Sequence, residues 1–595
     1  MKHDRKDKKF MGKLSPLIAC IGDYKKDSIL TPVFTAGEVF MEILIPFVTA
    51  AIIDEGIQGE NMGKVVQYGA IMLALAFASL FFGVQAGRYG ASASTGFACN
   101  LRQAMFENVQ TFSFSNIDKF STAGLVTRMT TDVTNLQNAY QMILRMAVRS
   151  PLMMICSMIM CFIISPRLSL VFLAALIFLG FVLIYIALKT MPIFRRGFDR
   201  YDELNASVQE NIAGIRVVKA YVREDYETKK FNAASERIYK VFTKAEALLA
   251  FNNPVMMLTV YACIIMLAWF GAHFVVGGSM TTGNLTSLFS YVMSMMMSLM
   301  MFSMVFVMIS MSTASVDRIS EVLSERADLT NPEAPLETVA DGSIDFDHVN
   351  FSYMAGSSED TLHDIDLHID AGETVGIIGG TGSGKSTLVS LISRLYDVQE
   401  GSVRVGGVDV RKYDMDVLRR QVAVVLQKNV LFSGTILDNL RWGKEDATEE
   451  ECIEACRQAC ADEFIDRMPD GYQTWIEQGG ANVSGGQRQR LCIARALLSA
   501  PKVLILDDST SAVDTATDAK IKQAFARKIP GTTKIIVSQR ISSIERSDRI
   551  LVLDEGRISG FDTHEKLLET NDIYREIYEV QMQSGGDFDE PGKED

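Results

Sequence analysis

The sequence lacks an excess of basic residues, since 58 lysines and arginines stand against 72 acidic residues, for a net charge of −14. Binding of nucleic acid requires a clustered basic face, so the composition argues against that class of function. The nine cysteines also lack the spacing of a secreted disulfide framework. The basic opening MKHDRKDKKFMGK has no adjacent signal-peptide core, and we therefore expect this segment to stay in the cytoplasm.

Charged residues of both signs are scarce, at 22% of the chain against 48% hydrophobic residues. Nearly all long apolar runs lie before residue 312, whereas a soluble protein would distribute them more evenly. A chain of 595 residues is also too long for a single core. We expect a membrane domain over residues 1–320, a linker over 321–342, a soluble domain over 343–582 and a disordered acidic tail over 583–595.

Six apolar stretches are long enough to cross about 30 Å of hydrocarbon as helices. They cover residues 29–53, 64–88, 140–164, 168–189, 248–272 and 284–310. Their polarity does not alternate as it does in the strands of a barrel, which favours helices. The connections 89–139 and 190–247 are about 50 residues long and contain repeated Lys and Arg, so we place them and both termini in the cytoplasm. Apolar residues recur there at helical spacing, which predicts that helices two to five continue beyond the bilayer.

A phosphate-binding loop begins the soluble half. The stretch GGTGSGKS at 379–386 fits G-x-x-x-x-G-K-[ST] and lies between a predicted strand and a predicted helix. Glycine allows the backbone N–H groups to surround phosphates, Lys385 can reach the β and γ oxygens, and Ser386 can hold Mg²⁺. The expected ATP-binding residues are Gly379, Gly380, Thr381, Gly382, Ser383, Gly384, Lys385, Ser386 and Thr387.

A hydrophobic strand ending in two acids faces this loop in the expected fold. The stretch VLIL at 503–506 runs into Asp507 and Asp508. A carboxylate at the C-terminal end of a buried parallel strand beside a phosphate-binding loop is placed to coordinate Mg²⁺. We therefore expect Asp507 and Ser386 to share a magnesium ion that accompanies ATP.

Further motifs carry a family resemblance. The stretch NVSGGQRQR at 482–490 is close to an LSGGQ signature, with Val483 where leucine is usual, and VAVVLQKNVLF at 422–432 resembles a glutamine loop. Tyr353 in FSY and the SAVD stretch at 511–514 fit the same pattern. In order and spacing, the chain resembles over nearly its full length a half-transporter of the ATP-binding cassette (ABC) exporter family.

The resemblance implies an all-α membrane domain of six helices with long intracellular helices, fused to an α/β P-loop (RecA-like) ATPase. It implies that Tyr353 stacks on adenine, that Gln427 joins the Mg²⁺ site next to the membrane domain, and that Asp514 belongs to the D-loop. The signature residues would contact ATP held by a second half-transporter; they are Ser484, Gly485, Gly486 and Gln487. Coupling helices near 112–124 and 208–219 would dock on the ATPase.

Two residues depart from the family pattern. Asp508 stands where the family has the glutamate that polarises the attacking water, and Gln539 stands where it has a switch histidine. The aspartate carboxylate is withdrawn by about 1.5 Å, and misplacement of that order can cost ~10²-fold in rate. Glutamine cannot carry the positive charge of imidazole. The catalytic set Asp508, Gln539 and Gln427 is therefore expected to be slow or inactive.

These departures resemble the degenerate-site subunit of bacterial heterodimeric multidrug-type exporters. The resemblance implies a different partner chain with glutamate and histidine at the matching positions, in a bacterial cytoplasmic membrane. A homodimeric exporter with slow ATPase and an ATP-gated regulator or channel are the alternatives. Drug, peptide and lipid all remain possible as cargo.

Two features of the membrane half point to the substrate cavity. Glu38 and Glu42 lie four residues apart, and so on one face of the first helix, where a charge at mid-bilayer costs ~2.5–3.5 kcal/mol. They can contact cationic substrate or form interhelical hydrogen bonds. The last helix is dense in methionine, whose flexible side chains suit a surface that packs around varied apolar ligands. Its expected cavity residues are Met293, Met297, Met300 and Met304.

Overall fold

The computed structural model of the chain describes residues 15–353, 360–508 and 515–583. Asp514 of the expected D-loop and residues 584–595 of the expected tail lie outside the described residues. The chain divides into two units, Met1–Gln110 with Ser121–Glu325, and Thr111–Phe120 with Arg326–Asp595. Each unit has hydrophobic cores of its own.

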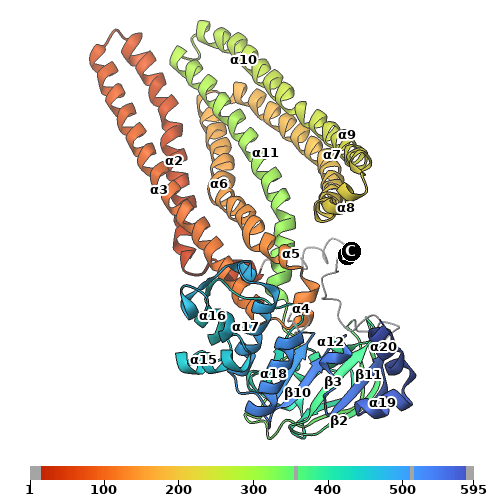
Figure 1. Cartoon of the computed structure of the whole chain (residues 1–595). Coiled ribbons are helices and arrows are strands. Elements are labelled where there is room, and N and C mark those ends of the chain that lie inside the picture. The colour runs from red at the N-terminus through yellow and green to blue at the C-terminus, as the bar shows by residue number, and fades with distance from the viewer. Residues whose placement is uncertain (1–14, 354–359, 509–514, 584–595) are drawn as a thin grey trace. The chain divides into compact units, whose positions relative to one another are not determined.

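The regular elements described in the first unit are helices, joined by short turns (Figure 1). Its α-helices are α2 (Lys25–Ala51), α3 (Met62–Gln110), α5 (Thr122–Thr127), α6 (Val133–Ile164), α7 (Pro166–Ala213), α8 (Ile215–Ala220), α9 (Glu224–Ala250), α10 (Asn252–Val276) and α11 (Thr282–Ser324). Three shorter helical turns join them, η1 (Gly22–Tyr24), η2 (Ile52–Ile57) and η3 (Arg128–Asp132).

Six helical segments of the described chain are long and apolar enough to cross a membrane. They are Gly22–Ile57, Met62–Gln110, Thr122–Ile164, Pro166–Phe194, Glu224–Val276 and Thr282–Ser324. Each predicted apolar stretch lies inside one of them, so the prediction of six membrane helices is confirmed.

Several helices are much longer than a bilayer requires. Helix α3 has 49 residues and α7 has 48, so at about 1.5 Å per residue each is ~70 Å long. Since the hydrocarbon layer is about 30 Å thick, the prediction that helices continue beyond it is confirmed. Helix α11 runs to Ser324, four residues past the expected domain boundary at 320.

The core of the first unit lies where α11 packs against α2 and its neighbours. Leu288, Val292 and Met295 of α11 are fully buried, at the spacing that places residues on one helix face. Tyr291 of the same helix donates its hydroxyl to the carbonyl of Ile43 in α2, at 2.8 Å. Such bonds between helices satisfy polar groups that hydrocarbon cannot.

The second unit is built on two larger sheets and a small hairpin. A six-stranded sheet has the order β12-β11-β3-β10-β9-β6, with β11, β3, β10, β9 and β6 parallel and β12 antiparallel at one edge. Its strands are β3 (Thr374–Gly379), β6 (Val422–Val425), β9 (Val503–Asp507), β10 (Thr533–Val537), β11 (Arg549–Asp554) and β12 (Arg557–Asp562). All five residues of β9 are buried, as expected for a central parallel strand.

A four-stranded antiparallel sheet has the order β2-β1-β4-β5. Its strands are β1 (Ile344–Phe351), β2 (Leu362–Ile369), β4 (Glu400–Val405) and β5 (Val408–Asp409). Side chains of β1, β2 and β4 share one hydrophobic cluster with the side chains of β3 and of helix α12 (Lys385–Ile392). The two sheets therefore enclose a common core around the helix that follows the phosphate-binding loop (Figure 1).

A helical insertion lies between β6 and β9. It contains α14 (Ile436–Arg441), α15 (Glu449–Gln458), α16 (Asp462–Ile465) and α17 (Gly485–Leu497), with the hairpin β7 (Gly434–Thr435) and β8 (Trp475–Ile476). The remaining helices of this unit are α4 (Phe114–Lys119), α13 (Met415–Gln421), α18 (Thr515–Lys528), α19 (His564–Thr570) and α20 (Asp572–Gln583). Six membrane helices fused to an α/β ATPase-type domain confirm the predicted fold class.

Candidate functional site

The phosphate-binding loop joins β3 to α12. Gly379 ends the strand with φ of 157°, and Gly382 and Gly384 have φ of 86° and 93°, in the left-handed region that favours glycine. A Cβ on Gly379 would lie 2.1 Å from the carbonyl oxygen of Leu553, so a side chain there requires the strands to move apart. These glycines allow the loop to turn tightly with its N–H groups exposed to a ligand.

Lys385 is the first residue of α12 and lies folded over the loop. Its ammonium donates to the carbonyl oxygens of Gly379 at 2.9 Å and Gly380 at 2.7 Å. Burial lowers the pKa of this ammonium, against the attraction of Asp507 and Asp508. The cation is thus held in the loop, where it can bind the phosphate oxygens of ATP in place of the two carbonyls.

Asp507 and Ser386 are in contact, as expected. The Ser386 hydroxyl donates to an Asp507 carboxylate oxygen at 3.0 Å. Burial raises the pKa of Asp507, which is 6% exposed at the end of β9. A buried carboxylate beside a hydroxyl supplies the oxygen donors that Mg²⁺ prefers, so these residues fit the expected magnesium ion.

Asp508 lies just beyond the strand, next to Gln427. Its backbone has φ of 47°, and its N–H donates to the carbonyl of Val537 in β10 at 3.0 Å. Burial raises the pKa of its carboxyl, opposed by a hydrogen bond with the Gln427 side chain and by the charge of Arg540. The structure therefore brings Gln427 and Asp508 together next to Asp507 and Ser386.

Gln539 follows β10 and is held from the C-terminal helix. The side-chain amide of Gln581 in α20 donates to the Gln539 carbonyl at 2.8 Å, and its oxygen accepts from the Ile541 N–H at 2.9 Å. Gln581 and Arg540 were not predicted as site residues. Gln581 lies 42 residues from Gln539, and no sequence motif links the two.

Tyr353 lies at the other side of the phosphate-binding loop, before the segment 354–359 that the structure does not describe. Its side chain is 51% exposed, and its hydroxyl is 3.0 Å from the Thr387 hydroxyl in α12. An exposed ring anchored to the helix that binds phosphates is well placed to stack on the base of the same nucleotide.

The signature residues begin helix α17. Ser484 is the N-cap, its hydroxyl accepts from the N–H of Gln487 at 3.3 Å, and the Gln487 side chain accepts from the Ser484 N–H at 2.9 Å. Gly485 and Gly486 form the first turn. The helix dipole and the N–H groups at this end favour a negatively charged ligand.

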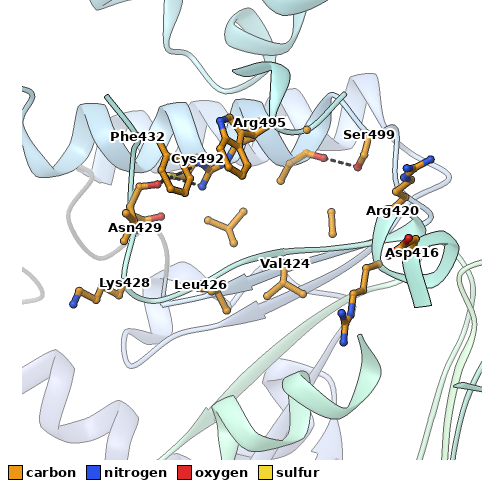
Figure 2. Close-up of a pocket in the computed structure, with 17 residues that line it drawn as sticks. Asp416, Arg420, Val424, Leu426, Lys428, Asn429, Phe432, Cys492, Arg495 and Ser499 are labelled. Carbon is orange, nitrogen blue, oxygen red and sulfur yellow. Dashed lines mark hydrogen bonds between the residues drawn. The ribbon is translucent and has the colours of Figure 1, made fainter. Parts of the chain in front are cut away.

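A groove of about 690 Å³ lies between β6 and α17 (Figure 2). Figure 2 shows Val424 and Leu426 on its strand side, with Cys492 and Arg495 on its helix side. The lining carries more basic than acidic side chains; the charged members are Arg419, Arg420, Lys428, Arg495 and Asp416. Leu426, Phe432 and Trp442 add exposed apolar surface. The groove thus lies directly beside Gln427 and is open to an apolar segment.

In the membrane unit, Glu38 and Glu42 contact an arginine of another helix. Arg149 of α6 donates to Glu38 at 2.5 Å and to both carboxylate oxygens of Glu42 at 2.8 Å. Arg145 lies 4.0 Å from Glu38. The structure thus shows the interhelical hydrogen bonds that were one of two expectations. Both arginines lie inside a predicted span, where a charge is costly enough to need a partner, and this signal was missed.

The methionines of α11 divide by helix face. Met293, Met297, Met300 and Met304 are 48%, 60%, 43% and 57% exposed in the single chain, whereas Met295 and Met296 are buried. The four exposed methionines form one stripe that the described helices leave about half exposed.

Comparison with known proteins agrees with these features. The family model for the ABC transporter transmembrane region matches residues 28–312, and the model for the ABC transporter ATPase matches residues 362–511. The ABC transporter ATP-binding protein YfiB of Bacillus subtilis is 35% identical over 545 residues, covering 92% of this chain and 94% of YfiB. A probable multidrug resistance ABC transporter ATP-binding/permease protein of the same species, YheI, is 35% identical over 487 residues, covering 81% and 82% of the two chains.

The fold also matches a solved structure. A bacterial Atm1-family ABC exporter with ATP bound superimposes with a TM-score of 0.81, covering 94% of this chain and 99% of that one, at 23% identity. Exporters of this kind carry a membrane domain and an ATPase domain, work as dimers in a membrane, and couple ATP hydrolysis to transport. The chain described here belongs to the ABC transporter family, as a half-transporter with the exporter fold.

Proposed function

We propose that the chain is one half of a heterodimeric ABC exporter and that it supplies the impaired one of two ATP sites. The observation that carries the proposal is the pair Asp508 and Gln539 beside an otherwise complete Mg²⁺–ATP site. The P-loop glycines, Lys385, Ser386 and Asp507 are all in place. We take the membrane domain as residues 1–320 and the ATPase domain as 343–582.

The side chain of Asp508 is too short to orient the attacking water as a glutamate at this position would. A glutamate at the same Cα extends its carboxylate by one further bond, about 1.5 Å, toward the γ-phosphate. Asp508 instead shares a hydrogen bond with Gln427 close to the strand end. Displacement by this length of the carboxylate that orients the attacking water lowers the rate of hydrolysis by ~10²-fold. ATP is therefore bound at this site but cleaved slowly.

Gln539 removes a second contribution to hydrolysis. Its amide can donate a hydrogen bond to the γ-phosphate, but it stays neutral and cannot exchange a proton. A Mg²⁺ ion held by Ser386, Asp507 and Gln427 would neutralise charge on the transferred phosphoryl group. Binding thus depends on residues that are present, and cleavage depends on residues that are changed.

The signature of this chain supports a different role at the second site. Ser484 and Gln487 form a complete capping box at the N-terminus of α17, so the anion-binding end of this helix is preorganised. We assign this end to ATP held on the P-loop of the partner. The partner, with glutamate and histidine at the changed positions, then hydrolyses the ATP that resets the cycle.

Closure of the two ATPases is transmitted through intracellular helices. Helix α4 and helix α8 lie within the expected coupling segments 112–124 and 208–219 or at their edge. Ile215 and Val217 of α8 are exposed in the single chain, as are Leu426 and Phe432 of the groove beside Gln427. We propose that such a groove receives the coupling helix of the partner subunit, since burial of both apolar surfaces stabilises that contact.

The cargo is proposed to be a small molecule, a lipid-like compound or a peptide with apolar groups. The exposed methionines of α11 support this class, because their unbranched side chains adapt to ligands of different shape. YheI, named as a probable multidrug transporter, is a relative of this type. We propose that both termini and the ATPase lie on the cytoplasmic side of a bacterial membrane, which the Lys- and Arg-rich connections support.

Transport by inverted membrane vesicles tests this function. Vesicles from cells that express the chain with its partner should accumulate a fluorescent apolar dye against its gradient when ATP and Mg²⁺ are added. Lys385→Ala is the matched control, because it removes the phosphate-binding ammonium. ATP binding without accumulation would favour an ATP-gated regulator or channel over an exporter.

A further inference from the structure

Tyr396 connects the expected adenine contact with helix α4. Tyr396 is half-buried in the second unit, between α12 and β4 in the chain. Its ring centroid lies 5.1 Å from that of Tyr353, with the two planes nearly perpendicular at 89°. It lies 5.8 Å from the ring of Phe351, the buried last residue of β1. The ring of Tyr396 thus packs in a T-shaped contact on the residue proposed to hold the base.

The hydroxyl of Tyr396 contacts helix α4. It donates to an Asp118 carboxylate oxygen at 2.7 Å, and the ring lies 6.1 Å from that of Phe114. Burial raises the pKa of this phenol, and so does the hydrogen bond to Asp118. The hydroxyl therefore remains protonated and donates at physiological pH, and a donor to a carboxylate forms one of the stronger hydrogen bonds of proteins.

The rest of α4 is anchored away from the nucleotide site. Ser113 and Ser115 donate their hydroxyls to the two carboxylate oxygens of Asp328. Asn116 donates to the carbonyl of Arg326 at 3.1 Å. These contacts hold the N-terminal part of α4, and they do not involve Tyr353 or α12. Asp118 and Phe114 of α4 thus contact Tyr396, which in turn packs on the proposed base-binding side chain, Tyr353.

We propose that Tyr396 is a positioning residue that transmits occupancy of the adenine contact to α4, separately from the phosphates. This inference rests on the proposed function, because it takes Tyr353 as the adenine contact. Tyr353 is 51% exposed, and a base stacked on it fixes its ring. Tyr396 packs edge-on against that ring, so fixing one orients the other and with it the hydroxyl that Asp118 accepts from.

The coupling is reciprocal by thermodynamic necessity. If a bound base tightens the Asp118–Tyr396 contact, the same contact tightens binding of the base by the same factor. Triphosphate alone lacks the base that stacks on Tyr353, and it reaches this residue only through the Thr387 hydroxyl, 3.0 Å from the Tyr353 hydroxyl. It should therefore protect α4 less than ATP does through this route. Base and phosphates then give separable signals at α4.

Hydrogen exchange of residues 111–120 in the purified, lipid-embedded transporter separates the two signals. Exchange is followed with Mg²⁺ and ATP, with Mg²⁺ and inorganic triphosphate, and without nucleotide. In the wild-type chain we expect ATP to slow exchange of these amides by roughly fivefold or more relative to triphosphate. Tyr396→Phe removes only the hydroxyl, and Asp118→Ala removes its acceptor from the other side. Both should abolish the difference between ATP and triphosphate.

Tyr413→Phe is the matched control. Tyr413 is fully buried in the same unit and donates its hydroxyl to the carbonyl of Val405 at 2.8 Å, so its loss removes a buried hydrogen bond elsewhere. This variant should keep the ATP-specific protection. Equal protection by ATP and triphosphate in the wild type, or undiminished ATP-specific protection in both Tyr396→Phe and Asp118→Ala, overturns the inference.

Equilibrium dialysis of ATP in the same samples distinguishes a failure of the proposed role of Tyr396 from a failure of the proposed function. Tight ATP binding with unchanged exchange of residues 111–120 contradicts the role of Tyr396 and leaves the transporter function standing. Absence of ATP binding contradicts the proposed function itself, and the inference fails with it.

Discussion

Asp507 and Asp508 are sequence neighbours with different backbone settings. Asp507 ends a fully buried strand and accepts a hydrogen bond from Ser386, whereas Asp508 has left-handed backbone and contacts Gln427. Burial raises the pKa of both carboxyls. In the absence of ligand, each charge opposes folding, and a Mg²⁺ ion bound by Asp507 and Ser386 would supply the compensating positive charge.

Asp507→Asn should stabilise the nucleotide-free chain. Because the pKa of Asp507 is raised in the fold, the folded protein binds its proton more tightly than the unfolded chain, and ionisation lowers stability above the unfolded pKa of about 3.9. Asparagine keeps an acceptor for Ser386 without the charge. Thermal denaturation at pH ~7 should show a rise of ~2–4 °C for each kcal/mol gained. The gain should disappear as the pH falls toward ~4.

The same variant should lose the further stabilisation that Mg²⁺ adds to ATP in the wild-type chain. Asp572→Asn is the control, since the Asp572 side chain is 95% exposed and its charge has no burial to oppose. A wild-type-like or lower melting temperature of Asp507→Asn at neutral pH would show that this carboxylate is not destabilised by burial.

At the scale of elements, helix α17 carries at its N-terminus the signature that we propose serves an ATP site in another subunit. Ser484 and Gln487 form a capping box, and α15 has the same device in Thr448 and Glu451. Each cap stabilises its own helix by ~0.5–2 kcal/mol. Of these two caps, only the cap of α17 belongs to the signature. A comparison of variants at the two caps therefore distinguishes an effect on stability from an effect on ATP turnover.

Ser484→Ala and Thr448→Ala should therefore have similar effects on stability and different effects on turnover. Both variants remove a hydroxyl that accepts from the N3 amide of its helix. Steady-state ATPase of the assembled transporter should fall on the order of 10²-fold for Ser484→Ala, the cost of losing one positioned donor. It should stay near wild type for Thr448→Ala. Equal activities of the two variants would remove α17 from the catalytic assembly.

Helices α2 and α6 are held together by an ion pair within the membrane domain. Arg149 contacts Glu38 and Glu42 through both ends of its guanidinium, and the Glu38 side chain is only 10% exposed. This geometry leaves one arginine as the shared partner of two carboxylates. Loss of the arginine leaves the carboxylates of Glu38 and Glu42 without this partner at a site where water is scarce.

Arg149→Met should destabilise the membrane domain by about 3 kcal/mol, which is at the low end of the range for loss of one partner of a buried ion pair. The low value is expected because Arg145 remains near Glu38. Combining it with Glu38→Gln and Glu42→Gln should restore much of the loss, since no unpaired carboxylate remains. Thermal denaturation in detergent measures both. Arg200→Met is the control, as its pair with Glu203 is about half exposed on both sides and worth ~0–1 kcal/mol. A triple variant no more stable than Arg149→Met would contradict this explanation.

Much of the site could be predicted from local sequence. The P-loop glycines, Lys385, Ser386 and Asp507 were identified because phosphate and Mg²⁺ binding requires these residue types at a fixed spacing. In the structure, Lys385 lies over the loop and Ser386 contacts Asp507. Tyr396 and Gln581 could not be found this way. Tyr396 acts through a contact with Asp118, 278 residues away, and Gln581 reaches the Gln539 carbonyl from α20. Contacts of this kind depend on tertiary packing and leave no periodicity or motif.

The fold was likewise predictable where hydrophobicity alone determines the structure. Hydrophobic length alone locates the six membrane helices. The grouping of Thr111–Phe120 with the second unit fits the expectation, implied by the family resemblance, that the segment 112–124 docks on the ATPase. Its polar anchors, such as Asp328, were not predicted, because they lie far along the chain. Arg149 shows the same limit, since its partners lie on a different helix.

For the whole molecule, the central proposal is an unequal division of ATP chemistry between two subunits. The chain carries one P-loop and one signature, which departs from the usual pattern at Val483. We propose that this signature serves the ATP site of the partner, while Asp508 and Gln539 weaken hydrolysis at the chain's own P-loop. ATP turnover by the purified chain alone, compared with its Asp508→Glu/Gln539→His double variant in the same lipid, tests the proposal most directly. The account predicts slow turnover by the wild-type chain and an increase on the order of 10²-fold in the double variant. Fast turnover by the wild-type chain that the two substitutions leave unchanged would contradict it.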